Sequence, residues 1–173
     1  MRALAALDLR LLRLLRTRGH TPAVEAAFIR LARAGENGLL WSAIAVAGGI
    51  LSRRRRDDYV RAIEIVLVTL LANTAVKYTV RRARPVLEDE LPALTPVLSG
   101  RSYPSAHAST SFAGARALAA AGLPSGPLHL VAVAMALSRP YLGVHYPSDV
   151  LAGAVLGDAL ARLMTSPARS RGR

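Results

Sequence analysis

The sequence predicts an all-α protein, a bundle of membrane-embedded helices preceded by two helices that lie outside the bundle. Three observations favour this class. Apolar residues make up 52% of the 173 residues, five apolar segments follow one another between residues 39 and 164, and no stretch shows the alternation of a β-strand. Disordered chains are less apolar than this, and a charged fraction of 20% is too high for a chain that lies wholly in lipid.

The first 37 residues predict two amphipathic helices. In the first, leucines recur at helical spacing and arginines fill most other positions, which is typical of a helix that lies on a membrane surface. Its leucines are Leu4, Leu7, Leu11, Leu14 and Leu15. A second helix is expected from Pro22 to about Arg33, because proline suits a first helical turn and glycines follow. An ordinary surface helix remains the alternative interpretation.

The five apolar segments are expected to form the bundle, over residues 39–51, 59–80, 108–123, 127–137 and 148–164. Each is near or below the roughly 18 to 20 residues that predict a membrane span with confidence. Their glycine and alanine content and the arginine run at 53–56 nevertheless favour a membrane bundle over a soluble one. The expected division is N-terminal helices 1–37, a catalytic bundle 38–165 and a basic tail 166–173.

Three charged residues fall inside apolar segments, where an unpaired charge is costly. They are Glu64, Arg116 and Asp158. We expect Arg116 to pair with Asp158 or with Glu64. In the alternative interpretation, Glu64 extends toward the arginine run at 53–56.

Residues that could carry out catalysis lie in three short stretches at segment ends, KYTVRRARP, YPSAHAS and SRPYLGVHYPSD. If the segments alternate in direction, all three stretches meet at one end of the bundle. The candidate residues are Lys77 and Arg84, then Ser105 and His107, and finally Arg139, His145 and Asp149.

These residue types favour phosphoryl transfer without a metal. The three cations can surround a phosphate, and helix starts near Ser105 and Pro147 add backbone N–H groups. Asp149 follows His145 by four residues across a helix start, so its carboxylate can orient the imidazole for attack on phosphorus. His107 is left to protonate the departing oxygen and then to activate water. The chain has no cysteine, which excludes thiolate metal sites.

At these positions the sequence resembles the type-2 phosphatidic acid phosphatase superfamily. Lysine, six residues and Arg-Pro match Lys77 to Pro85, and Ser-Arg, five residues, His, three residues and Asp match Ser138 to Asp149. Pro-Ser-Gly-His matches at Pro104 to His107, with Ala106 in place of the usual glycine. The resemblance implies a six-helix core, a histidine phosphatase that needs no metal or other cofactor, and Ser105 as part of the phosphate cage.

The short format is similar to bacterial family members that act on polyprenyl carriers, with polyprenyl diphosphate or decaprenylphosphoryl-phosphoribose phosphate as expected substrates. Phosphatidic acid and phosphatidylglycerol phosphate remain alternatives. A vanadate-dependent haloperoxidase and a soluble acid phosphatase would use the same cage. The formal net charge of +12 also fits a nucleic-acid-binding protein, but the apolar segments argue against it. The expected partners are therefore a lipid phosphate and membrane lipids, with no nucleic acid.

The other basic residues favour positions at the membrane surface. Arg81 and Arg82 predict an interfacial basic patch, with contact to the substrate headgroup as the alternative. If the segments alternate in direction, the run at 53–56 and the tail arginines Arg169, Arg171 and Arg173 are expected at the end opposite the three motifs. The positive-inside rule then predicts a multi-pass protein of the inner membrane whose site faces away from the cytoplasm. The arginines of the first helix favour the opposite orientation.

Overall fold

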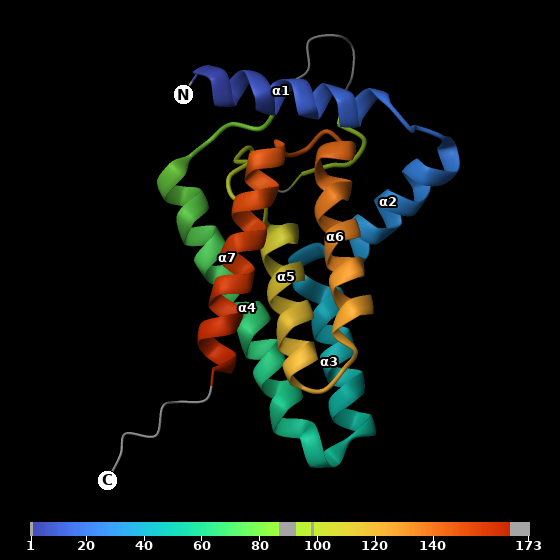
Figure 1. The fold of residues 1–173 in the computed structure, drawn as a ribbon, viewed down its shortest axis with the longest axis vertical. Helices are drawn as coiled ribbons and strands as arrows, with labels where there is room; N and C mark the ends of the chain where they lie inside the picture. The colour runs from blue at the N-terminus through green and yellow to red at the C-terminus, as the bar shows by residue number, and fades with distance from the viewer. Residues whose placement is uncertain (1, 87–92, 98, 167–173) are drawn as a thin grey trace.

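The computed structural model describes residues 2–86, 93–97 and 99–166, and this part of the chain is helical with no named strand (Figure 1). The all-α prediction is confirmed. The helices are α1 (Arg2–Thr17), α2 (Pro22–Ala34), the short η1 (Glu36–Gly38), α3 (Leu39–Leu51), the short η2 (Arg53–Arg55), α4 (Arg56–Val80), α5 (Ala106–Ala120), α6 (Ser125–Tyr141) and α7 (Pro147–Thr165).

The turn from α2 to α3 follows from local sequence. Thr21 caps α2 by accepting a hydrogen bond from the backbone N–H of Val24 at 3.3 Å, and proline occupies the first helical position as expected. Asn37 and Gly38 have positive φ angles of 50° and 77°. These are left-handed conformations that asparagine and glycine tolerate best, and they redirect the chain into α3.

Helix α5 lies at the centre of the bundle and packs against α3, α4, α6 and α7 (Figure 1). Its buried positions are mostly alanine, serine and glycine, which allows close helix approach. The closest approach is to α7. A Cβ atom added at Gly157 would lie 2.0 Å from the backbone oxygen of Ser109, and one added at Gly153 would lie 2.5 Å from that of Ser105.

The outward faces of the bundle are rich in large apolar side chains. Large aliphatic side chains are exposed on α3, α4, α6 and α7, while Ser109, Thr110 and Ser111 are buried. The exposed set includes Leu39, Val46, Ile50, Leu51, Val60, Leu67, Leu71, Leu130, Val133, Leu137, Leu151, Val155 and Leu163. An exposed apolar surface of this extent is typical of a site that contacts lipid or another protein.

Helix length does not confirm the predicted count of five membrane spans. In the described part of the chain, only residues 53–80 form a helical run that is both long and apolar enough to cross a membrane. The helices α5 and α6 have 15 and 17 residues, and α7 carries charged residues within its 19. Helices α5 and α6 are therefore shorter than a typical membrane span, and charged residues lower the hydropathy of α7.

Helix α1 lies across the end of the bundle where α6 ends and α7 begins (Figure 1). Its amphipathic pattern has two distinct sides. Leu4, Leu7, Leu11 and Leu14 are exposed, whereas Asp8, Leu12 and Arg16 are buried. One row of α1 leucines therefore lies away from the bundle, and the buried row includes charged side chains.

The charges inside the bundle are paired. Arg116 donates from Nε to Asp158, as expected, and Asp158 also accepts from Arg162 at 2.7 Å. Glu64 pairs with Arg61 at 3.1 Å. The expected pairing of Arg116 is therefore confirmed with Asp158, and the alternative, an extension of Glu64 toward residues 53–56, is wrong, because Glu64 pairs with a basic residue one helical turn earlier.

Candidate active site

The three motifs meet around a pocket of about 230 Å³. It lies where α4 ends, α5 begins, α6 ends and the chain enters α7. Five of the seven predicted residues line it, namely Lys77, Arg84, His107, Arg139 and His145. Ser105 and Asp149 are fully buried and do not line it. The prediction that helix ends converge on one pocket is confirmed.

Backbone carbonyl groups hold the Arg84 guanidinium at the pocket wall. Its Nε donates to the carbonyl oxygen of Ser99 at 2.7 Å, and its Nη1 donates to that of Val144 at 2.7 Å. Burial lowers the pKa of Arg84, and Asp149 partly opposes this effect; an arginine nevertheless stays protonated at any working pH. The site therefore presents a fixed positive charge with planar N–H donors.

Arg139 is the most deeply buried cation of the pocket, with 4% of its surface exposed. Within residues 2–86, 93–97 and 99–166, its Nε atom has no hydrogen-bond partner. A buried charged donor without a partner is costly. Because Lys77 and Arg84 line the same pocket, an anion that binds all three cations would offset that cost.

His145 is held as the tautomer that leaves Nε2 without a proton. Its Nε2 lies 3.2 Å from Nη1 of Arg84, and a guanidinium can only donate, so Nε2 accepts. The ring proton is then on Nδ1, which lies 3.6 Å from Oδ2 of Asp149, beyond hydrogen-bond length. Burial lowers the pKa of His145 to about 4, and repulsion by Arg84 and Arg139 adds to this effect. The imidazole is neutral at pH 7.

Two donors fix the carboxylate of Asp149 at the start of α7. Oδ2 accepts from the backbone N–H of Tyr146 at 2.9 Å, and Oδ1 accepts from Nη1 of Arg82 at 2.8 Å. The interpretation of Arg82 as part of an interfacial basic patch is therefore wrong. Its guanidinium turns inward because two buried carboxylates, Asp149 and Asp8, attract it. Arg81 is exposed and donates to the carbonyl oxygen of Tyr78 at 3.1 Å.

Ser105 caps α5 instead of lining the pocket. Its Oγ accepts from the backbone N–H of Ala108 at 3.4 Å, and its own N–H donates to the Asp149 carbonyl oxygen at 2.9 Å. Its hydroxyl does not line the pocket in this geometry, and its part in the phosphate cage stays a prediction. Ala106 is the first residue of α5 and is not among the described residues with positive φ, so alanine fits there without strain.

The second histidine contacts α2. His107 donates from Nε2 to the carbonyl oxygen of Ala32 at 3.0 Å, which leaves Nδ1 as the nitrogen available for the pocket. Asn73 also lines the pocket. Its Nδ2 donates to Ser109 Oγ at 2.9 Å and to the Pro104 carbonyl oxygen at 3.3 Å. Asn73 is a polar residue inside an apolar segment, and its structural role is to hold the start of α5.

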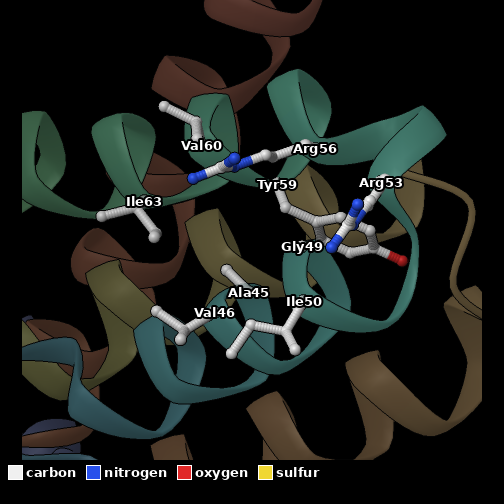
Figure 2. Close-up of a pocket in the computed structure, with 9 residues that line it drawn as sticks. All are labelled: Ala45, Val46, Gly49, Ile50, Arg53, Arg56, Tyr59, Val60 and Ile63. Atoms are coloured by element: carbon white, nitrogen blue, oxygen red, sulfur yellow. The ribbon is translucent and has the colours of Figure 1, made fainter.

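A larger cavity, of about 370 Å³, lies at the other end of the bundle between α3 and α4 (Figure 2). Apolar side chains line most of it, and Arg53, Arg56 and Tyr59 lie around it. It contains no residue of the three motifs. The chemistry is therefore assigned to the smaller pocket.

The comparisons with known proteins agree with this geometry. The sequence profile of the PAP2 superfamily matches residues 58–172. The chain belongs to the PAP2 superfamily. That match includes all seven candidate residues, from Lys77 on α4 to Asp149 on α7, and covers the four helices whose ends form the pocket.

Relatives within the PAP2 superfamily are phosphatases. The decaprenylphosphoryl-5-phosphoribose phosphatase of Mycobacterium tuberculosis is 38% identical over 158 residues, which cover 88% of this chain and 85% of that protein. The undecaprenyl-diphosphatase of Sulfolobus acidocaldarius is 31% identical over 131 residues, covering 72% of this chain and 61% of that protein. The chain is a phosphoric ester hydrolase.

A solved PAP2 structure has the same fold. The transmembrane PAP2 type phosphatidylglycerolphosphate phosphatase from Bacillus subtilis superposes with a TM-score of 0.77, covering 99% of this chain and 90% of that protein at 23% sequence identity. At that identity the similarity concerns the fold alone. It includes the N-terminal helices, since nearly the whole chain is matched.

Proposed function

We propose that the chain is an integral-membrane lipid phosphate phosphatase that hydrolyses a phosphomonoester on a polyprenyl carrier through a phosphohistidine. The observation that carries this proposal is the state of His145. Its Nε2 holds a lone pair and lies against Arg84, at a pocket that Lys77 and Arg139 also line. A neutral imidazole beside an anion site has the properties of a nucleophile toward phosphorus.

In the first step, Nε2 of His145 attacks phosphorus while the bond from phosphorus to the alcohol oxygen breaks. The cations Lys77, Arg84 and Arg139 stabilise the charge on the three non-bridging oxygens. His107 in its protonated form gives a proton from Nδ1 to the leaving oxygen, while its Nε2 stays on the Ala32 carbonyl oxygen. Asp149 stabilises the positive charge that His145 acquires.

In the second step, water hydrolyses the phosphohistidine. His107, now neutral, accepts a proton from the water as its oxygen attacks phosphorus. The bond from phosphorus to Nε2 breaks, inorganic phosphate leaves, and His145 returns to its neutral form. The two histidines therefore act as a nucleophile and an acid–base pair within one turnover.

The charge of the pocket favours chemistry without a metal ion. Three cationic side chains repel a divalent cation and already supply the charge that such an ion would provide. The acidic residue that lines the pocket is Glu36, and the described residues form no group of three side chains suited to a metal. We therefore propose that no cofactor takes part.

Glu36 and Asn37 favour a phosphosugar lipid over a lipid diphosphate. Both line the pocket, and Glu36 attracts Arg139. A carboxylate near the reacting phosphate repels a second phosphate group, whereas it accepts hydrogen bonds from hydroxyl groups. The substrate named for the M. tuberculosis relative carries its 5-phosphate on a ribose. We propose decaprenylphosphoryl-5-phosphoribose or a similar lipid as substrate, with polyprenyl diphosphate as the second candidate.

The large aliphatic side chains exposed on α3, α4, α6 and α7 support a membrane location, and we propose that α3 to α7 form five membrane-embedded helices. Residues 1–37 then form a surface unit, residues 38–165 the catalytic bundle, and 166–173 a tail of which 167–173 lie outside the described residues. The arginines at 53–56 lie at the end opposite the pocket. By the positive-inside rule, this supports an active site outside the cytoplasm.

A phosphate-release assay tests the function. We would measure kcat and KM of the detergent-purified protein on decaprenylphosphoryl-5-phosphoribose, a polyprenyl diphosphate and phosphatidic acid, with and without EDTA. We expect the highest kcat/KM for the phosphosugar lipid, no effect of EDTA, and loss of turnover and of the trapped phosphohistidine in His145→Gln. Turnover that persists in His145→Gln contradicts the covalent mechanism, and a preference for phosphatidic acid contradicts the proposed substrate.

Cysteine labelling tests the orientation, because the chain contains no cysteine of its own. Gly100→Cys lies at the active-site end and Gly126→Cys at the opposite end, and nothing lies within 4 Å of a Cβ atom at either position. A membrane-impermeant maleimide added to whole cells should label position 100 and not position 126. The reverse pattern would place the active site in the cytoplasm.

A further inference from the structure

Asp8 of α1 is a buried acid that the proposed mechanism does not use. It belongs to the N-terminal helix, before the part of the chain that the PAP2 profile matches, and only 5% of its surface is exposed. Buried carboxylates are rare unless they are paired. Helix α1 lies across the end of the bundle where α7 begins (Figure 1), and the Asp8 side chain contacts the first turn of α7.

Asp8 binds the start of α7 directly. Oδ1 accepts from the backbone N–H of Ser148 at 2.9 Å, and Oδ2 accepts from the Ser148 hydroxyl. Ser148 is the second residue of α7, where N–H groups lack helical partners and negative charge is favourable. Burial raises the pKa of Asp8, but the hydrogen bonds from Ser148 and Arg82 outweigh it and lower the pKa overall. Asp8 is therefore ionised at neutral pH.

Arg82 connects Asp8 to the active site. Its Nη2 donates to Asp8 Oδ2 at 2.7 Å, and its Nη1 donates to Asp149 Oδ1 at 2.8 Å. The guanidinium also lies over the ring of Tyr146, 4.0 Å from its centroid. Two carboxylates from α1 and α7 thus hold one arginine between them, and the α7 carboxylate is the one that faces His145.

We propose that Asp8 is a positioning residue for the reaction, which acts through Arg82 and Ser148 on Asp149 and so on His145. The proposal rests on the proposed function, since it assigns a role relative to that nucleophile. Asp8 fixes the place of Asp149 by binding both Ser148, its neighbour in the first turn of α7, and Arg82, its ion-pair partner. α1 thereby becomes part of the catalytic unit.

Asp8 also sets the charge that Asp149 presents. Asp8, Arg82 and Asp149 together carry one net negative charge. When Asp8 is neutral, that net charge becomes zero, and Arg82 competes more strongly for Asp149. The positive charge that His145 acquires during attack is then less stabilised, so the rate of the chemical step falls while the phosphate cage, which binds the substrate, is unchanged.

The test compares Asp8→Asn with a matched control, Asp57→Asn. Asp57 is an exposed acid in the first turn of α4, at the other end of the bundle. We expect Asp8→Asn to lower kcat by about tenfold to a hundredfold, the range typical of residues that orient a catalytic ligand. KM should stay within about twofold because the cage is intact. Asp57→Asn should match the wild-type protein, and an unchanged kcat in Asp8→Asn would overturn the proposal.

A double-mutant cycle identifies the route of the effect. Because Asp8 acts partly through Arg82, the Asp8→Asn/Arg82→Gln double variant should lose less kcat than the product of the two single losses. The acid limb of the kcat/KM profile should also move to lower pH in Asp8→Asn, because removing a negative charge lowers the pKa of His145. Multiplicative losses of kcat, or an unmoved acid limb, would show that Asp8 has only a structural role.

Two further measurements keep the result interpretable. If Asp8→Asn does not fold, Ser148→Ala removes only the hydroxyl from the same network, and it should lower kcat by a smaller factor with KM unchanged. A wild-type kcat in that variant would then overturn the proposal. His145→Gln separates the two hypotheses. If it still turns over, the proposed function fails; if it is inactive while Asp8→Asn has wild-type kcat, only the role of Asp8 fails.

Discussion

The contact of α7 with α5 at Gly157 gives a prediction that links packing to catalysis. A Cβ atom at Gly157 would lie 2.0 Å from the backbone oxygen of Ser109, about 1.4 Å short of the 3.4 Å at which ordinary contact begins. Backbone atoms cannot rotate away, so in Gly157→Ala the two helices must separate by roughly that distance. Ser109 follows His107 by two residues on α5, and the displacement therefore reaches the pocket.

The magnitude follows from two known effects. Overpacking of a well-packed interior costs about 1–3 kcal/mol, and a misplacement of about 1 Å at a reacting centre costs about a hundredfold in rate. Gly49→Ala is the matched control, because it makes the same change inside α3, where a Cβ atom has its nearest contact at 3.6 Å. Gly49→Ala should gain about 0.5–1 kcal/mol from helix propensity and keep wild-type kcat.

Thermal unfolding in detergent and phosphate release are the two assays. We expect Gly157→Ala to have a Tm lower than that of Gly49→Ala by about 2–4 °C for each kcal/mol, together with the hundredfold loss of kcat. If both variants show the same Tm and the same kcat, the helices do not approach as closely as described, and the placement of His107 by this contact is refuted.

Three further predictions concern single residues. In the folded protein the pKa of His145 is lowered to about 4, whereas the unfolded chain binds a proton at this residue from about pH 6.5 downward. The free energy of unfolding therefore decreases as the pH falls from 6.5 to about 4, by up to about 3 kcal/mol. His145→Gln should remove that part of the slope in Tm measured against pH. Ala106→Gly should leave kcat unchanged and lower the Tm, because a glycine in the first turn of α5 costs about 0.5–1 kcal/mol; an increase in kcat would show that the usual glycine has a catalytic advantage. Asp158→Asn leaves Arg116 without its partner and should cost about 1 kcal/mol in this partly exposed pair, with unchanged kcat; equal Tm values for variant and wild type would contradict this.

The pocket could be predicted from the sequence because the constraint is topological. Helices that alternate in direction bring every second connection to the same end. The three motifs therefore meet, because they lie at the end of residues 59–80, at the start of 108–123, and in the connection from 127–137 to 148–164. Spacing within each motif then sets which side chains face inward. Asp149 reaches back toward His145 because Pro147 begins α7 between them, a local relation that sequence spacing contains.

The role of Arg82 could not be predicted in the same way. Its two ion-pair partners, Asp8 and Asp149, are separated from it by 74 and 67 positions in the sequence. Asp8 lies on α1, and the sequence does not show which side of α1 packs against the bundle. An arginine beside an apolar segment fits a membrane-surface position equally well. Only the placement of α1 across the end of the bundle distinguishes a cation that contacts lipid headgroups from one that holds a catalytic carboxylate.

The distribution of side-chain sizes connects the fold to the proposed membrane. Burial stabilises a soluble protein in proportion to the apolar area removed from water, yet the central helix α5 buries mostly alanine, serine and glycine, which supply little area. Large aliphatic side chains that could supply it lie outside instead, and Leu51, Leu71 and Leu163 are 71–87% exposed. In water this arrangement would expose a large apolar surface. In lipid the same arrangement is favourable, because small interior residues permit the close packing that holds α5 against α7 and the outer leucines contact acyl chains. One pattern of side-chain sizes therefore has two consequences: close helix contacts, which shape the catalytic pocket, and an apolar outer surface. We expect the protein to require detergent to keep its activity once it is extracted.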